Sequence, residues 1–302
     1  MGRYSVIHLR DESTGAELSF VPERSGYVHQ IVLGGHELLW NYPDADALTG
    51  NSGHRNLALL PFPNRLLEGE YAWGGRQLKF PVNKPDTRSA LHGFGPHAPF
   101  ELVRVDLHRH RGEAHLRYLH APAEHPGAYP FLVRFDLTLG LDAAAGMASW
   151  RLAATNLGDA PAPVGLGWHP YFLVPGGADA WTLTMPPNER VELERAIPTG
   201  QRLAGLPPKQ ATPLDTDWDD CFALSERTDR TVELRGPDYG LRLTQGGNTR
   251  YTQLYMPPDA GSVAVEPMSC GVNAFQRSQD EVSVAPGEQV STSMSVVLAE
   301  AA

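Results

Sequence analysis

Apolar and polar residues alternate at every second position along most of the chain, which is typical of strands with one buried face. Residues 132–141 show this pattern clearly, because Phe135, Leu137, Leu139 and Leu141 fall on one face. Shorter runs of the same kind predict strands over residues 4–10, 16–21, 28–33, 100–108, 114–119, 147–154, 181–185, 191–193, 231–234, 241–244, 251–256, 263–265 and 291–298. Helical periodicity is missing, so we expect an all-β protein.

Turn residues separate these runs. The segment 68–80 predicts a hairpin that turns at Gly74-Gly75, a pair suited to a two-residue turn. Many short strands joined by such turns favour a sandwich or a large barrel-like sheet. Without an internal repeat or a low-complexity linker, we predict one β-sandwich domain over residues 1–302. The loops 41–55 and 83–99 are long for a compact domain, so we expect them to carry function.

The composition of the chain reduces the number of function classes that it could belong to. The 302 residues are 41% hydrophobic and carry a net charge of −10, which argues against nucleic acid as the main partner. The sequence has no apolar run of about 20 residues to span a membrane and no apolar signal-peptide core near its start. We therefore expect a cytoplasmic protein. Two cysteines, Cys221 and Cys270, are too few for a disulfide framework and are expected to be reduced thiols.

The segment 165–176 places a histidine where its orientation can be fixed. His169 follows an apolar run and precedes Pro170, which favours extended backbone at His169 and disfavours a central strand after it. Its near-neutral pKa suits it to act as an acid or a base. The alternative is a strand-end histidine that packs on Tyr171 and hydrogen-bonds a carbonyl group.

A glutamate follows another apolar run. Glu266 stands between Val263-Ala264-Val265 and Pro267, so we expect it at the end of a buried strand. Desolvation there raises the pKa of a carboxyl group toward that of a useful general base. A surface glutamate at a strand end is the less favoured alternative.

Three other segments carry candidate binding residues. Arg65 precedes the predicted hairpin and offers a fixed fork of donors for hydroxyl groups. His92 lies in the glycine-flanked loop Leu91-His-Gly-Phe-Gly95, where backbone can approach a ligand closely. Asp219 and Asp220 precede Phe222 and can accept hydrogen bonds from a sugar. A surface ion pair for Arg65, a bracing role for His92 and a turn-forming role for the aspartates remain open.

Taken in order from Asn64-Arg65 to Asn273-Ala274-Phe275, these motifs resemble the aldose 1-epimerase (galactose mutarotase) family. The resemblance includes His92, His169-Pro170-Tyr171-Phe172, Asp219-x-x-Phe222 and Glu266-Pro267. It implies a large β-sandwich, the galactose mutarotase-like supersandwich, and an isomerase that needs no cofactor or metal. By the same resemblance, Glu266 is the base and His169 the acid, while His92, Arg65 and Asp219 surround the sugar. Many relatives have a histidine where Asp220 stands, which leaves the choice between the two aspartates open.

The reaction that the resemblance implies is interconversion of the α and β anomers of a hexose. Ring opening needs a base on the C1 hydroxyl and an acid on the ring oxygen, and closure reverses both roles. Trp40, Trp168 and Tyr171 are candidate aromatic faces for the sugar. The substrate stays open among neutral hexoses, a hexose 6-phosphate and a sulfonated hexose.

Other function classes remain. A carbohydrate-binding protein could use the same aromatic and polar residues without acid–base chemistry. A glycoside hydrolase would need two carboxylates beside one bond, for which Asp219 and Glu266 are candidates. A metal-dependent isomerase could use the histidines at 108, 110, 115, 120 and 125, although we expect these to be surface residues.

Overall fold

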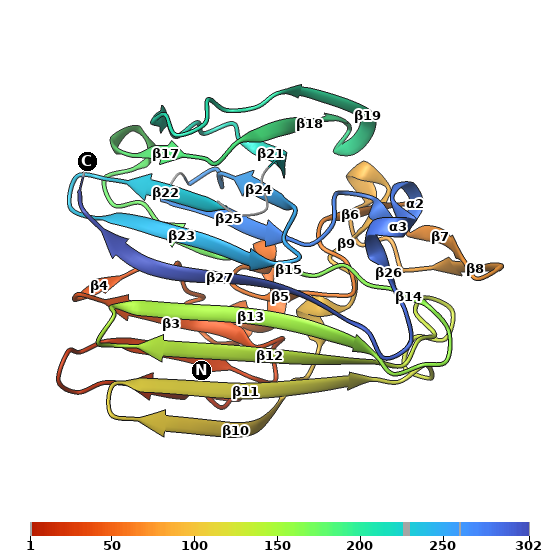
Figure 1. The fold of residues 1–302 in the computed structure, drawn as a ribbon, viewed down its shortest axis with the longest axis horizontal. Helices are drawn as coiled ribbons and strands as arrows, with labels where there is room; N and C mark the ends of the chain where they lie inside the picture. Colours follow the sequence, from red (N-terminus) through yellow and green to blue (C-terminus); the bar gives the residue numbers. More distant parts are fainter. Residues whose placement is uncertain (1, 226–229, 260, 302) are drawn as a thin grey trace.

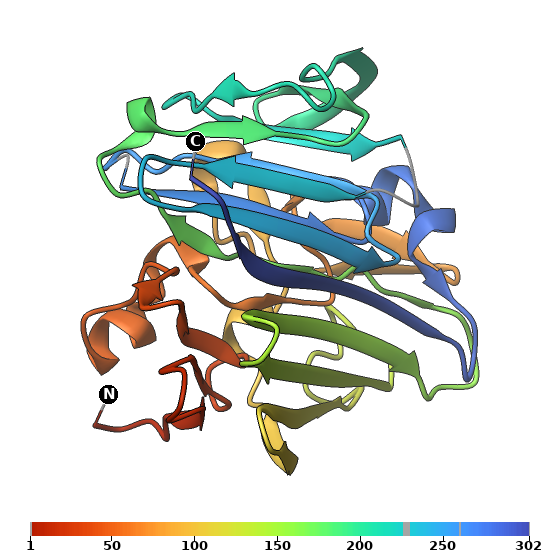
Figure 2. The same ribbon diagram turned by 60° about the vertical axis from the view of Figure 1, so that its left-hand side comes forward.

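The computed structural model describes residues 2–225, 230–259 and 261–301 and confirms an all-β sandwich (Figures 1 and 2). One layer is a nine-stranded sheet in which neighbouring strands are antiparallel. Its spatial order is β10 (Glu101–His108), β11 (Arg111–His120), β12 (Val133–Asp142), β13 (Met147–Asn156), β27 (Gln289–Ala299), β23 (Gly240–Gly247), β22 (Thr231–Arg235), β17 (Thr182–Thr184) and β20 (Thr212–Pro213).

A second, eight-stranded sheet lies behind this layer in the view of Figure 1 and carries Asp219 and Glu266, while His169 lies between two of its strands. Its path is β19 (Ile197–Ala204), β18 (Asn188–Glu194), β21 (Asp219–Leu224), β24 (Tyr251–Tyr255), β25 (Ser262–Met268), β15 (Gly167–Trp168) and β5 (Ala58–Leu59), with β16 (Tyr171–Leu173) also paired to β25. Side chains from both sheets share one large hydrophobic core, in which Trp150 of the first sheet stacks on Trp168 of the second.

Smaller sheets close the ends of the sandwich. A four-stranded sheet consists of β1 (Ile7–Arg10), β2 (Glu17–Val21), β3 (Tyr27–Leu33) and β4 (His36–Glu37). Three strand pairs complete the fold: β6 (Arg65–Leu67) with β9 (Ser89–Leu91), β7 (Glu70–Trp73) with β8 (Arg76–Lys79), and β14 (Ala162–Pro163) with β26 (Ser283–Val284). The β7–β8 pair confirms the predicted hairpin and its turn at Gly74-Gly75.

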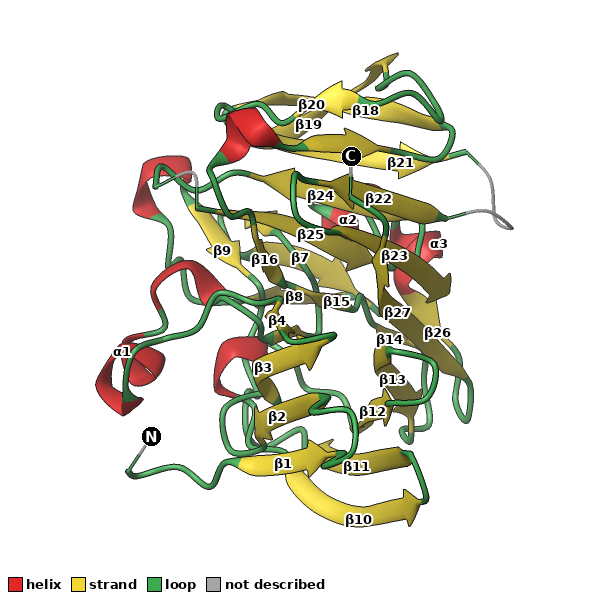
Figure 3. Cartoon of the chain, turned by 90° about the vertical axis from the view of Figure 1, so that its left-hand side faces the viewer, coloured by secondary structure: helices red, strands yellow, loops and turns green. Residues whose placement is uncertain are grey.

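The expectation of a chain without helices is wrong in detail. The described residues include three short α-helices, which are labelled in Figure 3: α1 (Ala45–Gly50), α2 (Ala274–Arg277) and α3 (Gln279–Val282). Helix α1 begins because the Asp44 side chain accepts a hydrogen bond from the Ala47 N–H, which caps its first turn. Helices this short show no apolar periodicity, so the sequence pattern does not reveal them. Within the described ranges, the helices are all too short and too polar to cross a membrane.

Two strands are longer than the sequence pattern predicts. The short run 191–193 is part of a long hairpin, β18–β19, which turns at Arg195 and Ala196. Both residues have positive φ without being glycine or asparagine, so the usual turn signal is missing. Strand β25 continues through Glu266 and Pro267 to Met268, so the prediction that the strand ends at Glu266 is wrong.

Gly26 allows the four-stranded sheet to pack against the nine-stranded sheet. It has positive φ, and a Cβ atom there would overlap the Leu137 side chain of β12. We predict that Gly26→Ala lowers the free energy of unfolding by about 2–4 kcal/mol, because backbone strain and overpacking add. Gly15→Ala is the control, since Gly15 also has positive φ but open space around it. It should cost only about 1 kcal/mol. Equal losses in denaturant unfolding would contradict this packing argument.

Candidate active site

A polar cavity of about 180 Å³ opens where β6, β9, β16, β21, β24 and β25 meet the long loops. All five predicted site residues line it. The full lining is Gly53, His54, Asn64, Arg65, Lys84, Leu91, His92, His169, Tyr171, Asp219, Gln253, Tyr255 and Glu266. The loops 41–55 and 83–99 contribute His54, Lys84 and His92, so both long loops do reach this cavity.

His169 lies directly after β15 and is held by the backbone of a neighbouring loop. Its N–H donates to the Leu57 carbonyl, and its carbonyl accepts from the Asn56 N–H at 2.8 Å. The imidazole ring stacks on Tyr171, with centroids 5.0 Å apart and planes 13° apart. Strand pairing resumes at β16, although Pro170 disfavours a central strand after it. This strand is only three residues long, so Pro170 interrupts the pairing at His169 without ending it.

Glu266 lies in the middle of β25, pairs in register with Gln253 of β24 and is 2% exposed. On its other side β25 pairs with β16 at residues 262–264 and with β15 at Met268, so Glu266 lies between these two pairings. Its Oε1 atom is 3.4 Å from Nε2 of His169, and Oε2 has no hydrogen-bond partner in the described protein. Because both side chains are buried, the pair can exchange a proton with a molecule in the cavity without competition from bulk solvent.

Burial shifts the pKa values of Glu266 and His169 in opposite directions. The pKa of Glu266 lies well above its ordinary value because of burial and the nearby negative charge of Asp219, and Arg65 opposes the shift. The pKa of His169 lies well below its ordinary value, mainly because of burial. Both shifts favour the neutral forms of the two groups, with the proton on Glu266 and none on His169.

The protonation of His92 follows from its hydrogen bond. Its Nδ1 accepts from the Asn64 N–H at 3.0 Å, so in the neutral ring Nε2 carries the hydrogen. Burial lowers the pKa of His92 well below its ordinary value, with His54 and His169 acting in the same direction. His92 is thus a neutral hydrogen-bond donor. Its backbone has φ of 61°, and Gly93 follows because a Cβ atom there would meet the Leu60 carbonyl.

Arg65 and Asp219 face the cavity from different strands. Arg65 begins β6, and its Nε atom is buried without a hydrogen-bond partner among the residues that the structure describes. Asp219 accepts a 2.8 Å hydrogen bond from Nε2 of Gln253, whose Oε1 accepts from Nδ2 of Asn64 at 3.1 Å. Asp220 points to the other face of β21 and lies 3.7 Å from Arg190. The geometry therefore assigns Asp219 to the cavity and leaves Asp220 outside its lining.

Some lining residues were not predicted as site residues. Gln253 pairs with Glu266 in register across β24 and β25, and both Gln253 and its neighbour Thr252 are buried polar residues. Two successive polar residues inside the predicted strand Tyr251-Thr-Gln-Leu-Tyr255 are a local signal that could have revealed Gln253. His54 and Lys84 have no comparable local signal, because loop folding alone brings them to the cavity. Burial lowers the pKa of His54 to about 4.

The prediction of which aromatic residues face the sugar is only partly right. Tyr171 lines the cavity, and Tyr255 joins it from β24. Trp168 lies in the core against Trp150, and the Trp40 ring is covered by the Arg55 guanidinium at 3.7 Å. Neither tryptophan is part of the lining, so the aromatic surface here is provided by tyrosine.

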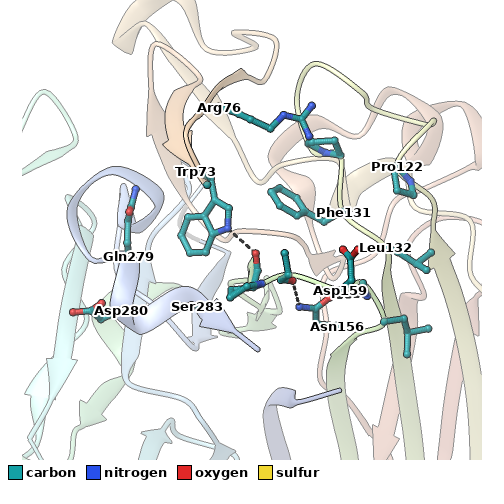
Figure 4. Close-up of a pocket in the computed structure, with 16 residues that line it drawn as sticks. Trp73, Arg76, Pro122, Phe131, Leu132, Asn156, Asp159, Gln279, Asp280 and Ser283 are labelled. Carbon is teal, nitrogen blue, oxygen red and sulfur yellow. Dashed lines mark hydrogen bonds between the residues drawn. The ribbon is translucent and has the colours of Figure 1, made fainter. Parts of the chain in front are cut away.

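A larger cavity of about 850 Å³ lies elsewhere, between the β7–β8 hairpin, residues 122–132 and α3 (Figure 4). Trp73 and Phe131 contribute to its wall, and its carboxyl groups are Asp159 and Asp280. The described residues that line it include no histidine, so it offers no acid–base pair like that of the smaller cavity. Size alone would therefore select a cavity without such a pair.

The histidines considered as metal ligands do not form a cluster. Among the described residues, no group of three or more histidine, cysteine or acidic side chains is arranged to hold a metal ion. The expectation that all five are surface residues is wrong for His120, which is buried, stacks on Phe94 and contacts His125 at 3.0 Å. The two cysteines are free, as predicted, and both are buried.

Comparisons with known proteins agree with this geometry. The chain is 26% identical to the uncharacterized protein YihR of Escherichia coli (strain K12) over 247 residues, which cover 78% of this chain and 76% of YihR. Galactose 1-epimerase from Lactobacillus acidophilus superposes with a TM-score of 0.82 at 12% identity, covering 99% of this chain and 100% of that chain. A galactose mutarotase-like protein from Clostridium acetobutylicum gives 0.82 at 15% identity, covering 98% and 99%. These structures confirm the predicted fold.

The sequence profile described as Aldose 1-epimerase matches residues 26–296. That range contains every residue that lines the small cavity. The chain therefore belongs to the aldose 1-epimerase family.

Proposed function

We propose that the protein is an aldose 1-epimerase that interconverts the α and β anomers of a free hexose in the 180 Å³ cavity. The observation that carries this proposal is the buried pair of Glu266 and His169, which lie 3.4 Å apart at the base of a polar cavity. The galactose 1-epimerase fold supports the same activity but does not identify the sugar.

In the proposed reaction, ionised Glu266 takes the proton of the C1 hydroxyl as the C1–ring-oxygen bond breaks and a C1 carbonyl forms. Protonated His169 gives its proton to the ring oxygen, while the Nε2–H of His92 donates a hydrogen bond to that oxygen. After rotation about the C1–C2 bond, closure returns both protons. Opening thus leaves Glu266 protonated and His169 neutral, which is the distribution that burial favours.

The cavity also bears on the other function classes. A binding protein gains nothing from burying a carboxyl group beside an imidazole, because such burial carries a desolvation cost. A glycoside hydrolase must hold two sugar units, whereas this cavity is smaller than the roughly 300 Å³ at which pockets for larger ligands begin. Both considerations favour a reaction on one sugar ring.

Two cations at the cavity support a second candidate, an epimerase for an anionic hexose. Lys84 and Arg65 both line the cavity, and within the described ranges neither forms an ion pair with a carboxylate. A phosphate or sulfonate group on the sugar would supply the missing negative charge.

Glu266→Gln should keep the fold and sugar binding but lower kcat by about 10²–10⁴-fold, because an amide cannot accept the C1 hydroxyl proton. Polarimetry of freshly dissolved anomers measures the rate. Asp220→Asn is the matched control, since this carboxyl group lies outside the cavity lining, and it should retain full activity. Near-normal turnover of Glu266→Gln would exclude Glu266 as the base.

The pH dependence of kcat/KM should be bell-shaped, because the active pair holds one proton. As pH falls, the pair gains a second proton on His169, whose lowered pKa places the acidic limb below about pH 6.5. As pH rises, the pair loses its last proton from Glu266, whose pKa is raised. His169 therefore gives the acidic limb and Glu266 the alkaline limb. This is the reverse of the simpler assignment, in which the carboxylate gives the acidic limb and the histidine the alkaline limb.

Single variants test this assignment. Glu266→Gln should remove the alkaline limb from the pH profile of the residual activity. His169→Asn should change both limbs, because the apparent pKa values belong to the pair of groups and not to one residue. His92→Asn should lower the rate but keep both limbs, since asparagine tolerates positive φ and can still accept from the Asn64 N–H. An alkaline limb that survives in Glu266→Gln and disappears in His169→Asn would restore the simpler assignment.

A panel of neutral, 6-phosphorylated and 6-sulfonated hexoses, followed by NMR exchange between anomers, separates the two candidates. If an anionic sugar is the substrate, Lys84→Ala should raise its KM by about 10-fold or more and leave neutral sugars unaffected. Equal effects on neutral and anionic sugars would reject the anionic candidate.

A further inference from the structure

The strand β10 (Glu101–His108) forms one edge of the nine-stranded sheet, and its far side is unpaired in the part of the chain that the structure describes (Figures 1 and 3). An unpaired edge presents a row of backbone N–H and carbonyl groups that can pair with another strand. Monomeric proteins usually protect such edges with polar side chains or a covering segment.

β10 is unusually apolar for an exposed edge. Of the seven large hydrophobic residues that are exposed among the described residues, four lie on it. They are Leu102 at 40%, Val103 at 55%, Val105 at 36% and Leu107 at 72% exposure. Val105 and Leu107 pair with Ala114 and Gly112 of β11, which places them on the same face of the sheet. The exposed apolar row therefore follows one face of the edge strand.

The opposite face of β10 carries two opposite charges. Arg104 and Asp106 lie two residues apart on that face, with Nε of Arg104 2.8 Å from Oδ2 of Asp106. In an antiparallel pair of two such strands with Val105 opposite its own copy, Arg104 stands opposite Asp106 of the second copy, and Asp106 stands opposite Arg104. In the same register, Val103 stands opposite Leu107 of the second copy.

We propose that β10 pairs with β10 of a second copy across a two-fold axis at Val105, joining the nine-stranded sheets into one. The strand is self-complementary in this register, as a two-fold interface requires. Each apolar residue meets an apolar residue, and each charge meets its opposite. The β-bulge between Leu102 and Arg104 bends the strand, so the paired segment is residues 103–107. The cavity lining includes no residue of β10, so pairing leaves the cavity accessible.

Sedimentation equilibrium of the full chain over a range of concentrations tests the pairing. Because the interface is short, it belongs among the small interfaces of less than about 1,200 Å², and the dimer should dissociate on dilution. The mass should rise from 33.0 kDa toward twice that value. A wild-type protein that stays monomeric up to its solubility limit would overturn the proposal.

Charge variants test the register. Arg104→Asp places two acidic residues opposite two acidic residues, and Asp106→Arg places basic residues opposite basic residues, so each variant alone should be monomeric. An equal mixture of the two should form a heterodimer, because every opposed pair is then complementary. If both single variants dimerise as wild type does, the contact lies elsewhere. If the mixture stays monomeric, the register is wrong.

Two controls separate pairing from general surface effects. Leu157→Asp changes an exposed apolar residue outside β10 and should leave the dimer intact. Circular dichroism and anomer exchange should be unchanged in all variants, because none of the altered residues lines the small cavity. If Leu157→Asp disrupts the dimer as strongly as Arg104→Asp does, the interface is not β10.

Discussion

The burial of one carboxyl group beside one imidazole is the constraint on which the rest of the site depends. Glu266 lies in the middle of a strand with neighbours on both sides, where an ionised carboxylate is costly. The protein keeps it there with His169 at 3.4 Å and with Arg65 near enough to oppose the shift in its pKa. Two buried groups that share one proton can exchange acid and base roles without a net change of charge.

The surrounding fold holds these two groups by backbone rather than by side chains. Asn56 and Leu57 bond the backbone of His169 on one side, while Gln253 of β24 pairs with Glu266 on the other. Strand backbones in the interior of a sheet move little, so the distance between the two groups is set by sheet register. The long loops then add His54, Lys84 and His92, which complete the cavity around the pair.

Much of this arrangement can be predicted from the sequence, but the prediction depends on local signals. Alternation predicts the strands of the nine-stranded sheet well, because they are long and have one buried face. It fails at β18–β19, where the turn at Arg195 and Ala196 lacks a turn signal, and at the capped helix α1. Arg65, His92, His169, Asp219 and Glu266 do meet in one cavity. Gln253 and Lys84 join them through tertiary folding, and Trp40 and Trp168 have partners that their sequence neighbours do not reveal.

The hydrogen-bond chain from Asp219 through Gln253 to Asn64 has a direction. A carboxylate only accepts hydrogen bonds, so the Gln253 amide must turn its NH₂ group toward Asp219 and its oxygen toward Asn64. Asn64 must then donate to that oxygen, which leaves its own Oδ1 buried and, among the described residues, without a hydrogen-bond partner. The charge of Asp219 thus fixes the orientation of the Asn64 amide two side chains away. In the proposed reaction, a sugar hydroxyl group could donate to this Oδ1 and an ether oxygen could not, so Asp219 would act on selectivity beyond its own contacts.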